Sequence, residues 1–285
     1  MLRFEVFCPA TPPALPADVT LRVEAEHWLA ALKAGLRKVG GPQLTTNVLC
    51  DVQADGSIHV SDPQGGGVFR IQELRAEPAA VPAAAGQGGP SSRAASVEEV
   101  APSAIPPGPI GRAARAASAE DVLAELFERV ADLARQPDRS AGLGFLLDLA
   151  MEKVDAEAGS VFLARLEGRE LELAVARGPR AKELLALGVA VPVGVGIVGF
   201  CAQEDVCLAV SDAERDARFH RAVSEAIGYE TRSLLCAPIA RKGQVLGAIE
   251  VLNKRGGRPF GSADLSVLSY LAHQAAVFIA RGSAS

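Results

Sequence analysis

Residues 228–264 read GYETRSLLCAPIARKGQVLGAIEVLNKRGGRPFGSAD, and this stretch decides the fold. Two apolar runs, 233–239 and 244–252, flank a polar turn at 240–243, which predicts a strand–turn–strand hairpin. Residues 245–252 are apolar at both alternating sets of positions, apart from one carboxylate. A strand that is apolar on both faces is covered on both sides. We therefore expect the hairpin to form the middle of a sheet.

The exception in the second strand is Glu250, whose neighbours on the same face are Leu246, Ala248 and Leu252. A carboxylate on a covered face must find a partner, reach solvent through a pocket, or take up a proton. The sequence therefore predicts an acidic side chain turned into an enclosed space.

The same stretch resembles the second half of a GAF domain of the cyclic-nucleotide phosphodiesterase kind. In that family a signature runs Asn-Lys, a variable gap, Phe, three residues and Asp-Glu. Asn253, Lys254, Phe260 and Asp264 match it, and Leu265 stands where the final Glu would be. The resemblance covers roughly residues 118–281 and implies a central antiparallel sheet covered by helices. It gives the four matching residues a scaffold role, with a salt bridge between the Lys and the Asp.

The resemblance also implies a ligand pocket. Ser160, Thr231 and Glu250 match polar positions around the base in the cyclic-nucleotide-binding members, whereas Ile227 and Ser224 replace a Thr and an Asp of those members. We expect the ligand-binding residues to be Ser160, Gly196, Ile197, Phe219, Ile227, Thr231 and Glu250. A cavity of roughly a few hundred Å3 would support ligand sensing. A pocket filled by Ile227 or Phe219 would support a ligand-free scaffold, in which Glu250 pairs with backbone or with an arginine such as Arg232.

Composition divides the chain into three parts. Residues 1–75 alternate apolar runs and turns as a small α+β unit of unknown function, with a helix expected at 25–39. Of the 42 residues from 76 to 117, 30 are Ala, Pro, Gly or Ser, which predicts a flexible linker. Residues 118–285 form the expected GAF domain, opening with a helix from Ser118 to Gln136 and including another at 216–227.

Charge and hydropathy favour a cytoplasmic protein without a nucleic-acid or membrane role. The chain has 34 Asp plus Glu against 29 Lys plus Arg, so it lacks a basic footprint for nucleic acid. Its start lacks the pattern of a secretory signal. Residues 184–203 carry no charge, but their glycines and Pro192 favour a strand and a short helix over a membrane span.

Five cysteines (Cys8, Cys50, Cys201, Cys207 and Cys236) lack C-x-x-C spacing, and no histidine has metal-ligand spacing. We expect no metal and no cofactor. Some small GAF proteins reduce free methionine sulfoxide with cysteines around the pocket, which is the enzyme alternative. This chain has Val198 where that family has a cysteine within its G-x-x-G helix. The expected function is therefore non-catalytic.

The final helix, expected at 262–281, has apolar residues at 265, 268, 272, 275 and 279, a seam of the coiled-coil kind. The Ser118–Gln136 helix is its expected partner. Paired helices are how GAF domains commonly dimerise, so the resemblance implies a parallel homodimer; burial within one monomer is the competing explanation. The prediction is a regulatory protein whose GAF domain binds a small molecule, with a cyclic nucleotide as one candidate, or holds a dimer together.

Overall fold

The computed structural model describes residues 1–44, 46–63, 67–74, 119–165 and 168–282 of the 285-residue chain. The chain forms two units, one of residues 1–74 with 128–285 and the other of residues 75–127. The predicted linker at 76–117 and the predicted helix start at Ser118 lie outside the described residues. The proposed division at residues 75 and 118 therefore stays a prediction.

The N-terminal part is a five-stranded antiparallel arrangement with one helix. Its elements are β1 (Leu2–Cys8), β2 (Val19–Ala25), α1 (Trp28–Val39), β3 (Asn47–Val52), β4 (Ile58–Ser61) and β5 (Val68–Glu73). Helix α1 begins later than expected because β2 continues to Ala25. The His27 ring accepts a hydrogen bond from the Ala30 N–H and caps the helix. Gly40, in the left-handed conformation, ends it.

The second part supplies six strands and most of the helices. Its helices are α2 (Ala119–Ala131), α3 (Arg139–Val154), α4 (Ala181–Leu187), α5 (Gly196–Glu204), α6 (Arg221–Ile227) and α7 (Ser262–Gly282), with 3-10 turns at Asp132–Arg135 and Arg255–Gly257. Its strands are β6 (Ala156–Ala164), β7 (Glu170–Arg177), β8 (Ala190–Pro192), β9 (Cys207–Val210), β10 (Leu234–Arg241) and β11 (Gln244–Lys254). The predicted central hairpin is β10–β11, so the fold class is confirmed: α and β elements around a large, mainly antiparallel sheet.

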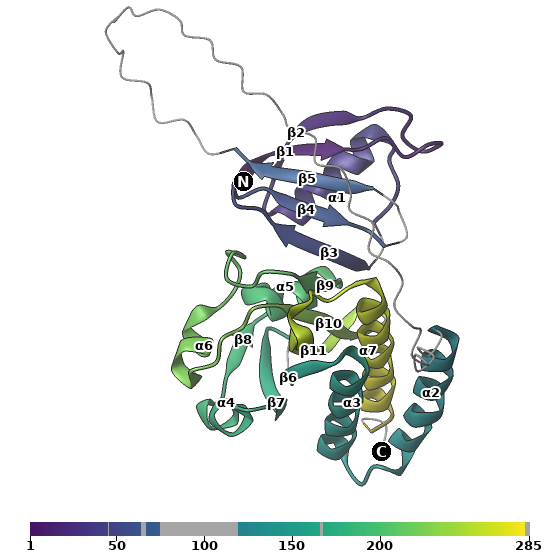
Figure 1. Cartoon of the computed structure of the whole chain (residues 1–285), viewed down its shortest axis with the longest axis vertical. Coiled ribbons are helices and arrows are strands. Elements are labelled where there is room, and N and C mark those ends of the chain that lie inside the picture. The colour runs from purple at the N-terminus through teal and green to yellow at the C-terminus, as the bar shows by residue number, and fades with distance from the viewer. Residues whose placement is uncertain (45, 64–66, 75–118, 166–167, 283–285) are drawn as a thin grey trace, which may run out of the picture. The chain divides into compact units, whose positions relative to one another are not determined.

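One sheet joins the two parts (Figure 1). Its strand order is β2-β1-β5-β4-β3-β9-β10-β11-β6-β7-β8. The pair β3–β9 is parallel and matches Asn47 with Cys207 and Cys50 with Val210. The other neighbouring pairs are antiparallel. The strands of the N-terminal part therefore extend the sheet that contains the central hairpin.

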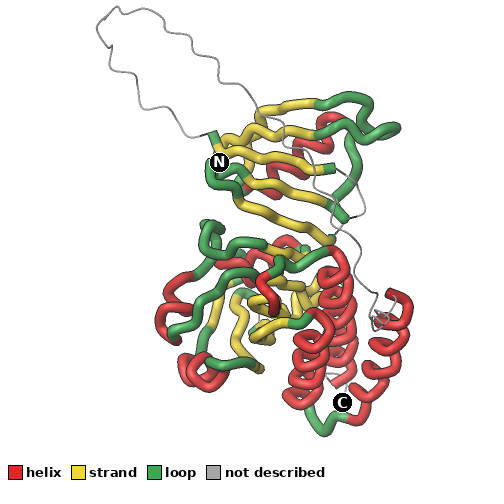
Figure 2. Tube along the Cα trace, in the orientation of Figure 1, coloured by secondary structure: helices red, strands yellow, loops and turns green. Residues whose placement is uncertain are grey.

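Each face of the sheet has its own helices (Figure 2). One continuous core runs from Leu29 and Leu32 of α1, through Phe200 of α5, to Cys236 and Ala248 on the strands. On the alternate strand positions, residues such as Ile249 are also fully buried. Helices α3 and α7 pack on the strands and on each other. The double covering predicted for β11 is thus present.

The apolar seam of α7 is buried within the chain. Leu265, Leu268, Ala272, Ala275 and Ile279 are all buried, and α7 packs on α3 and β10. The partner that the structure provides within this unit is α3. The pairing with the Ser118–Gln136 helix stays a prediction, because the start of that helix lies outside the described residues. Residues 262–281 are long and apolar enough to cross a membrane by length and composition, with a mean hydropathy of 1.3, but half of the stretch is buried inside the protein.

The helix predicted at 216–227 begins only at Arg221. Asp216 is the reason, because its carboxylate accepts hydrogen bonds from both the backbone and the side chain of Arg218. Such local side-chain bonds compete with helix formation. The segment before α6 is therefore a turn. The uncharged run 184–203 likewise forms no single helix but contains the end of α4, β8 and most of α5.

Candidate functional site

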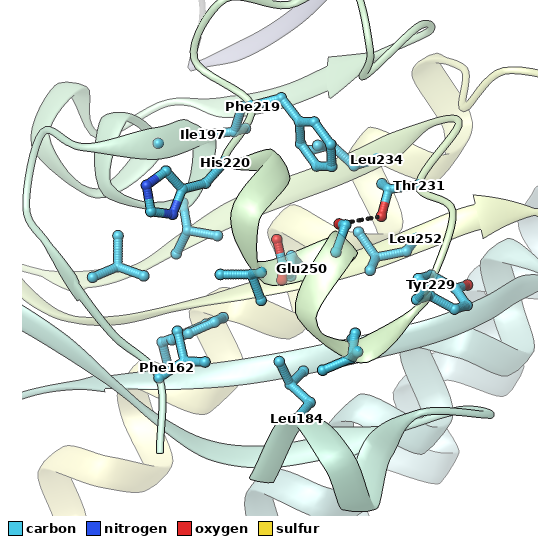
Figure 3. Close-up of a pocket in the computed structure, with 17 residues that line it drawn as sticks. Phe162, Leu184, Ile197, Phe219, His220, Tyr229, Thr231, Leu234, Glu250 and Leu252 are labelled. Atoms are coloured by element: carbon cyan, nitrogen blue, oxygen red, sulfur yellow. Dashed lines mark hydrogen bonds between the residues drawn. The ribbon is translucent and has the colours of Figure 1, made fainter. Parts of the chain in front are cut away.

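A pocket lies against β6, β10 and β11 and beneath α4, α5 and α6 (Figure 3). It encloses about 100 Å3. The residues that line it are Phe162, Leu184, Val189, Val191, Gly196, Ile197, Val198, Phe219, His220, Val223, Ser224, Ile227, Tyr229, Thr231, Leu234, Glu250 and Leu252. Most of these side chains are apolar, and the lining includes no lysine or arginine among the described residues.

The structure brings the seven residues expected to bind ligand close together. Six of them line this pocket: Gly196, Ile197, Phe219, Ile227, Thr231 and Glu250. Ser160 lines a neighbouring hollow that shares Leu184, Ile227, Tyr229 and Leu252 with the pocket. It reaches the pocket through Glu250, because the two residues are paired across β6 and β11.

Glu250 points into the pocket (Figure 3), where the Ser160 hydroxyl donates to its carboxylate Oε1 at 2.6 Å. Arg232 is not its partner, since that guanidinium binds Glu157 at 2.9 Å. Burial raises the pKa of the Glu250 carboxyl, and the hydrogen bond from Ser160 partly opposes this rise. The floor of the pocket thus holds an acidic group that accepts a hydrogen bond from one hydroxyl.

This raised pKa gives the protein a pH-dependent stability term. Because the folded-state pKa of Glu250 lies above its unfolded value, the folded state is most stable below the unfolded pKa and loses stability as pH rises through the folded pKa. Glu250→Gln removes that loss. We expect the Tm of this variant, relative to wild type, to rise as the pH increases above the unfolded-state pKa of about 4.3.

The control for this experiment is Glu172→Gln, at an exposed carboxyl whose pKa is lowered by Arg165. There the sign is opposite, because that carboxylate contributes stability above its unfolded pKa. Thermal melts across the pH range measure both variants. Parallel curves for wild type and Glu250→Gln would show that Glu250 titrates as if it were in water.

Two short helices, α4 and α6, cover the pocket. They contact each other, and neither helix contains a buried residue. A segment with so little buried surface opens at a low free-energy cost. Beneath α6, the hydroxyls of Ser224 and Thr231 lie 3.3 Å apart (Figure 3). Ser224, which the resemblance marked as a loss, thus supplies a polar group to the lining.

Sequence reasoning missed several lining residues that follow from periodicity. Three of them, His220, Val223 and Ser224, are spaced by three and four residues from one another and from the predicted Ile227. This spacing places them on one side of α6. Phe162 and Leu252 lie two positions beyond Ser160 and Glu250 on their strands and so share their face. Once Glu250, Ser160 and Ile227 are assigned to the pocket, these spacings identify their neighbours.

The residues assigned to the scaffold lie beside the pocket. Lys254 at the end of β11 donates to both oxygens of Asp264, at 2.6 and 2.5 Å, in the first turn of α7. Phe260 is buried under the Lys254 ammonium, 5.9 Å from the ring centroid. Asn253 accepts from the backbone of Arg232 and donates to the carbonyl of Glu230. These contacts hold the segment that carries Tyr229 and Thr231.

The cysteines do not line this pocket, although Cys236 on β10 pairs with Glu250 on β11. All five are free and buried, and none lines it. A hydrogen bond with Cys201 and burial raise the pKa of Cys236 well above its usual range, and burial does the same for the pKa of Cys207. Thiols in this state are poor nucleophiles. Within the described part of the chain, no group of three or more His, Cys, Asp or Glu residues is placed to hold a metal ion.

An antiparallel sheet with helices α3 and α7 on it and a small pocket closed by short helices defines an α+β domain that encloses a small, mostly apolar space. Residues 143–279 match the family model described as GAF domain, and this part of the chain is a GAF domain. A GAF domain from a phosphoenolpyruvate-protein phosphotransferase of Coxiella burnetii has the same fold, with a TM-score of 0.52 and 21% identity over 58% of this chain and 96% of that one.

Curated relatives match the same region. A protein of Takifugu rubripes named dual 3',5'-cyclic-AMP and -GMP phosphodiesterase 11A is 32% identical over 150 residues, 50% of this chain and 17% of the relative. A cGMP-specific 3',5'-cyclic phosphodiesterase of Drosophila mojavensis is 30% identical over 150 residues, 47% of this chain and 13% of the relative. The chain thus spans less than a fifth of the length of these relatives.

Proposed function

We propose that the protein is a non-catalytic regulator whose GAF domain binds a small molecule in the pocket above Glu250. The observation that carries this proposal is a mostly apolar pocket with one partly buried acidic group and a few hydroxyls, closed by two helices without buried residues. Few, well-placed polar groups in an apolar lining are typical of ligand sites. A lid that opens cheaply allows a ligand to enter and be enclosed.

A cyclic nucleotide is the first candidate ligand, because the relatives named above are cyclic-nucleotide phosphodiesterases. A base that carries N–H donors could pair with Glu250, and a phosphate could lie at the start of α5, where Gly196 and Ile197 line the pocket. Two features oppose it. The described residues of the lining include no lysine or arginine, and about 100 Å3 is small beside the usual ligand cavity of about 300–1,000 Å3. Helices α4 and α6 must therefore move outward to admit a nucleotide.

A titration panel tests this proposal. Cyclic AMP, cyclic GMP, the linear nucleotides and the free bases are added to the full chain, with binding measured by calorimetry and by shifts in Tm. We expect at least one compound to raise the Tm of wild type and to bind at least tenfold more weakly to Glu250→Gln. Ser266→Ala, at an exposed serine of α7, is the matched control and should bind like wild type. Equal affinity for wild type and Glu250→Gln would place the ligand elsewhere.

The second candidate is a ligand-free scaffold, and the small size of the pocket favours it. Phe219 and Ile227 both line the space and restrict it. In a scaffold these side chains serve as core, so Ile227→Ala lowers stability without changing any binding. In a sensor, Ile227→Ala enlarges the pocket and changes the affinity for ligands of different size. The same panel, run on Ile227→Ala, separates the two roles.

A sulfoxide reductase is disfavoured because the cysteines are buried and lie outside the pocket. A homodimer through the terminal helices would need a surface other than the α7 seam, which is buried within the chain. A cytoplasmic location without a nucleic-acid or membrane role accords with the near-balanced charge.

A further inference from the structure

The segment that leads into the pocket lid is held by the N-terminal part of the chain. The guanidinium carbon of Arg218 lies 4.5 Å from the ring centroid of Phe200 in α5 and 5.2 Å from that of Trp28 in α1. The two rings are stacked, with centroids 6.0 Å apart and planes inclined by 24°. Arg218 therefore contacts an aromatic pair that is formed jointly by the first turn of α1 and the middle of α5.

An ion pair with Asp216 holds the Arg218 side chain in this position. Asp216, whose side chain is 3% exposed, accepts from its guanidinium, and Nη2 lies 3.8 Å from Cys50 Sγ on β3. The buried cation is thus paired through Asp216 on its own segment, while its stacking partners belong to other elements. If the segment moves, Arg218 must leave the rings and carry Asp216 with it.

The two residues after Arg218 belong to the pocket. Phe219 and His220 line it, and α6 begins at Arg221. The other end of the connection is α5, whose first turn lines the pocket and whose last residue, Glu204, binds both His27 and Lys33 of the N-terminal part, at 3.2 and 3.0 Å. Both segments that border the pocket on this side are therefore anchored to the start of α1.

We propose that the contact of Arg218 with Trp28 and Phe200 couples closure of the pocket lid to docking of the N-terminal helix α1. The lid here is residues 219–228, and the docked state is the one in which Trp28 stacks on Phe200. Opening the lid withdraws Arg218 from the rings and loosens α1, and loosening α1 frees Arg218 and opens the lid. The biological use of this coupling rests on the proposed function, because the lid closes over the ligand pocket.

Buried donors without hydrogen-bond partners are compatible with a contact between Arg218 and Trp28 that has a docked and an open state. Among the described residues, the buried Trp28 Nε1 and Arg218 Nη1 have no hydrogen-bond partner. A buried donor without an acceptor raises the free energy of the state that contains it. The docked state therefore has an opposing term, and a modest change at either end is sufficient to shift its population.

Hydrogen exchange of the full chain without any ligand tests the coupling, so its result does not depend on whether the pocket binds a small molecule. Trp28→Leu removes the aromatic face from the N-terminal side and leaves the sequence of the lid unchanged. We expect exchange of residues 219–228 to become about tenfold faster in this variant. The matched control is Ile71→Val, a buried change on β5 of the same part, which should leave exchange of the lid as in wild type.

Arg218→Lys tests the coupling in the opposite direction. It keeps the charge but loses the planar group that stacks on the rings. We expect faster exchange at residues 28–33 of α1, and this variant also covers the case in which Trp28→Leu does not fold. The proposal is overturned if Trp28→Leu folds and leaves the lid unchanged, or if Arg218→Lys leaves α1 unchanged. A lid that responds equally to Ile71→Val would show general destabilisation and would overturn it as well.

Discussion

Asn253→Ala is expected to lower the free energy of unfolding by about 4 kcal/mol, because this residue combines a special backbone conformation with four side-chain hydrogen bonds. Asn253 is 1% exposed and has φ 54°, in the left-handed region. Its Oδ1 accepts from the N–H groups of Arg232 and Ser233, and its Nδ2 donates to the Tyr229 hydroxyl and the Glu230 carbonyl. Alanine tolerates the conformation poorly and leaves these groups unpaired.

Asn253→Gly is the matched variant. Glycine adopts a positive φ without strain, so it isolates the lost hydrogen bonds and should be about 1 kcal/mol less destabilising than alanine. Urea unfolding measures both. Because the bonded segment carries Tyr229 and Thr231, both variants should also weaken any ligand that binds in the pocket. A loss below about 1 kcal/mol in both would mean that the hydrogen bonds of Asn253 are replaced by water at little cost.

Gly247→Ala is expected to lower the free energy of unfolding by about 3 kcal/mol, through a backbone clash. A Cβ at Gly247 on β11 would lie 2.2 Å from the carbonyl oxygen of Phe162 on β6, next to the irregularity between Val161 and Phe162. Backbone held by strands on both sides cannot move away, as a flexible side chain could. At about 2–4 °C per kcal/mol for a protein of this size, the Tm should fall by roughly 9 °C.

Gly35→Ala is the control for this prediction. Gly35 lies inside α1, and a Cβ there would meet Val6 Cγ1 at 3.4 Å, an ordinary contact. Alanine in a helix interior is better than glycine by about 0.5–1 kcal/mol, so this variant should be as stable as wild type or more so. Similar losses from both substitutions would contradict the assignment of Gly247 to a close approach between backbones.

Local pattern predicts the central hairpin well. The alternation in residues 245–252 predicts burial on both faces directly, and Glu250 is the one polar exception in that stretch. The same reasoning could not place α6 correctly, because the carboxylate of Asp216 bonds locally and delays the helix to Arg221. Apolar periodicity reports a helical stretch but not the competing bonds that end or delay it.

The sequence could not predict which distant segments pair with each other in the fold. Strand β9 is four residues long and buried throughout, which predicts a covered strand but not a partner. Its parallel pairing with β3, about 160 residues earlier in the chain, depends on tertiary packing. The partner of the α7 seam was likewise ambiguous, because an apolar stripe is equally compatible with α3 and with a second chain. The stacking of Trp28 on Phe200 depends on the same pairing of β3 with β9, which joins the N-terminal strands to the rest of the sheet.

The central claim is that the pocket above Glu250 encloses a small molecule, and a native mass spectrum of the freshly purified full chain tests it most directly. The spectrum also counts the protomers, which tests the proposed homodimer. Ile227→Trp, which fills the pocket, is measured beside wild type. We predict that wild type retains, or takes up from the nucleotide and base panel, a small mass that Ile227→Trp does not hold. Wild type that carries no added mass under any of these conditions, or the same mass on both proteins, would contradict the account.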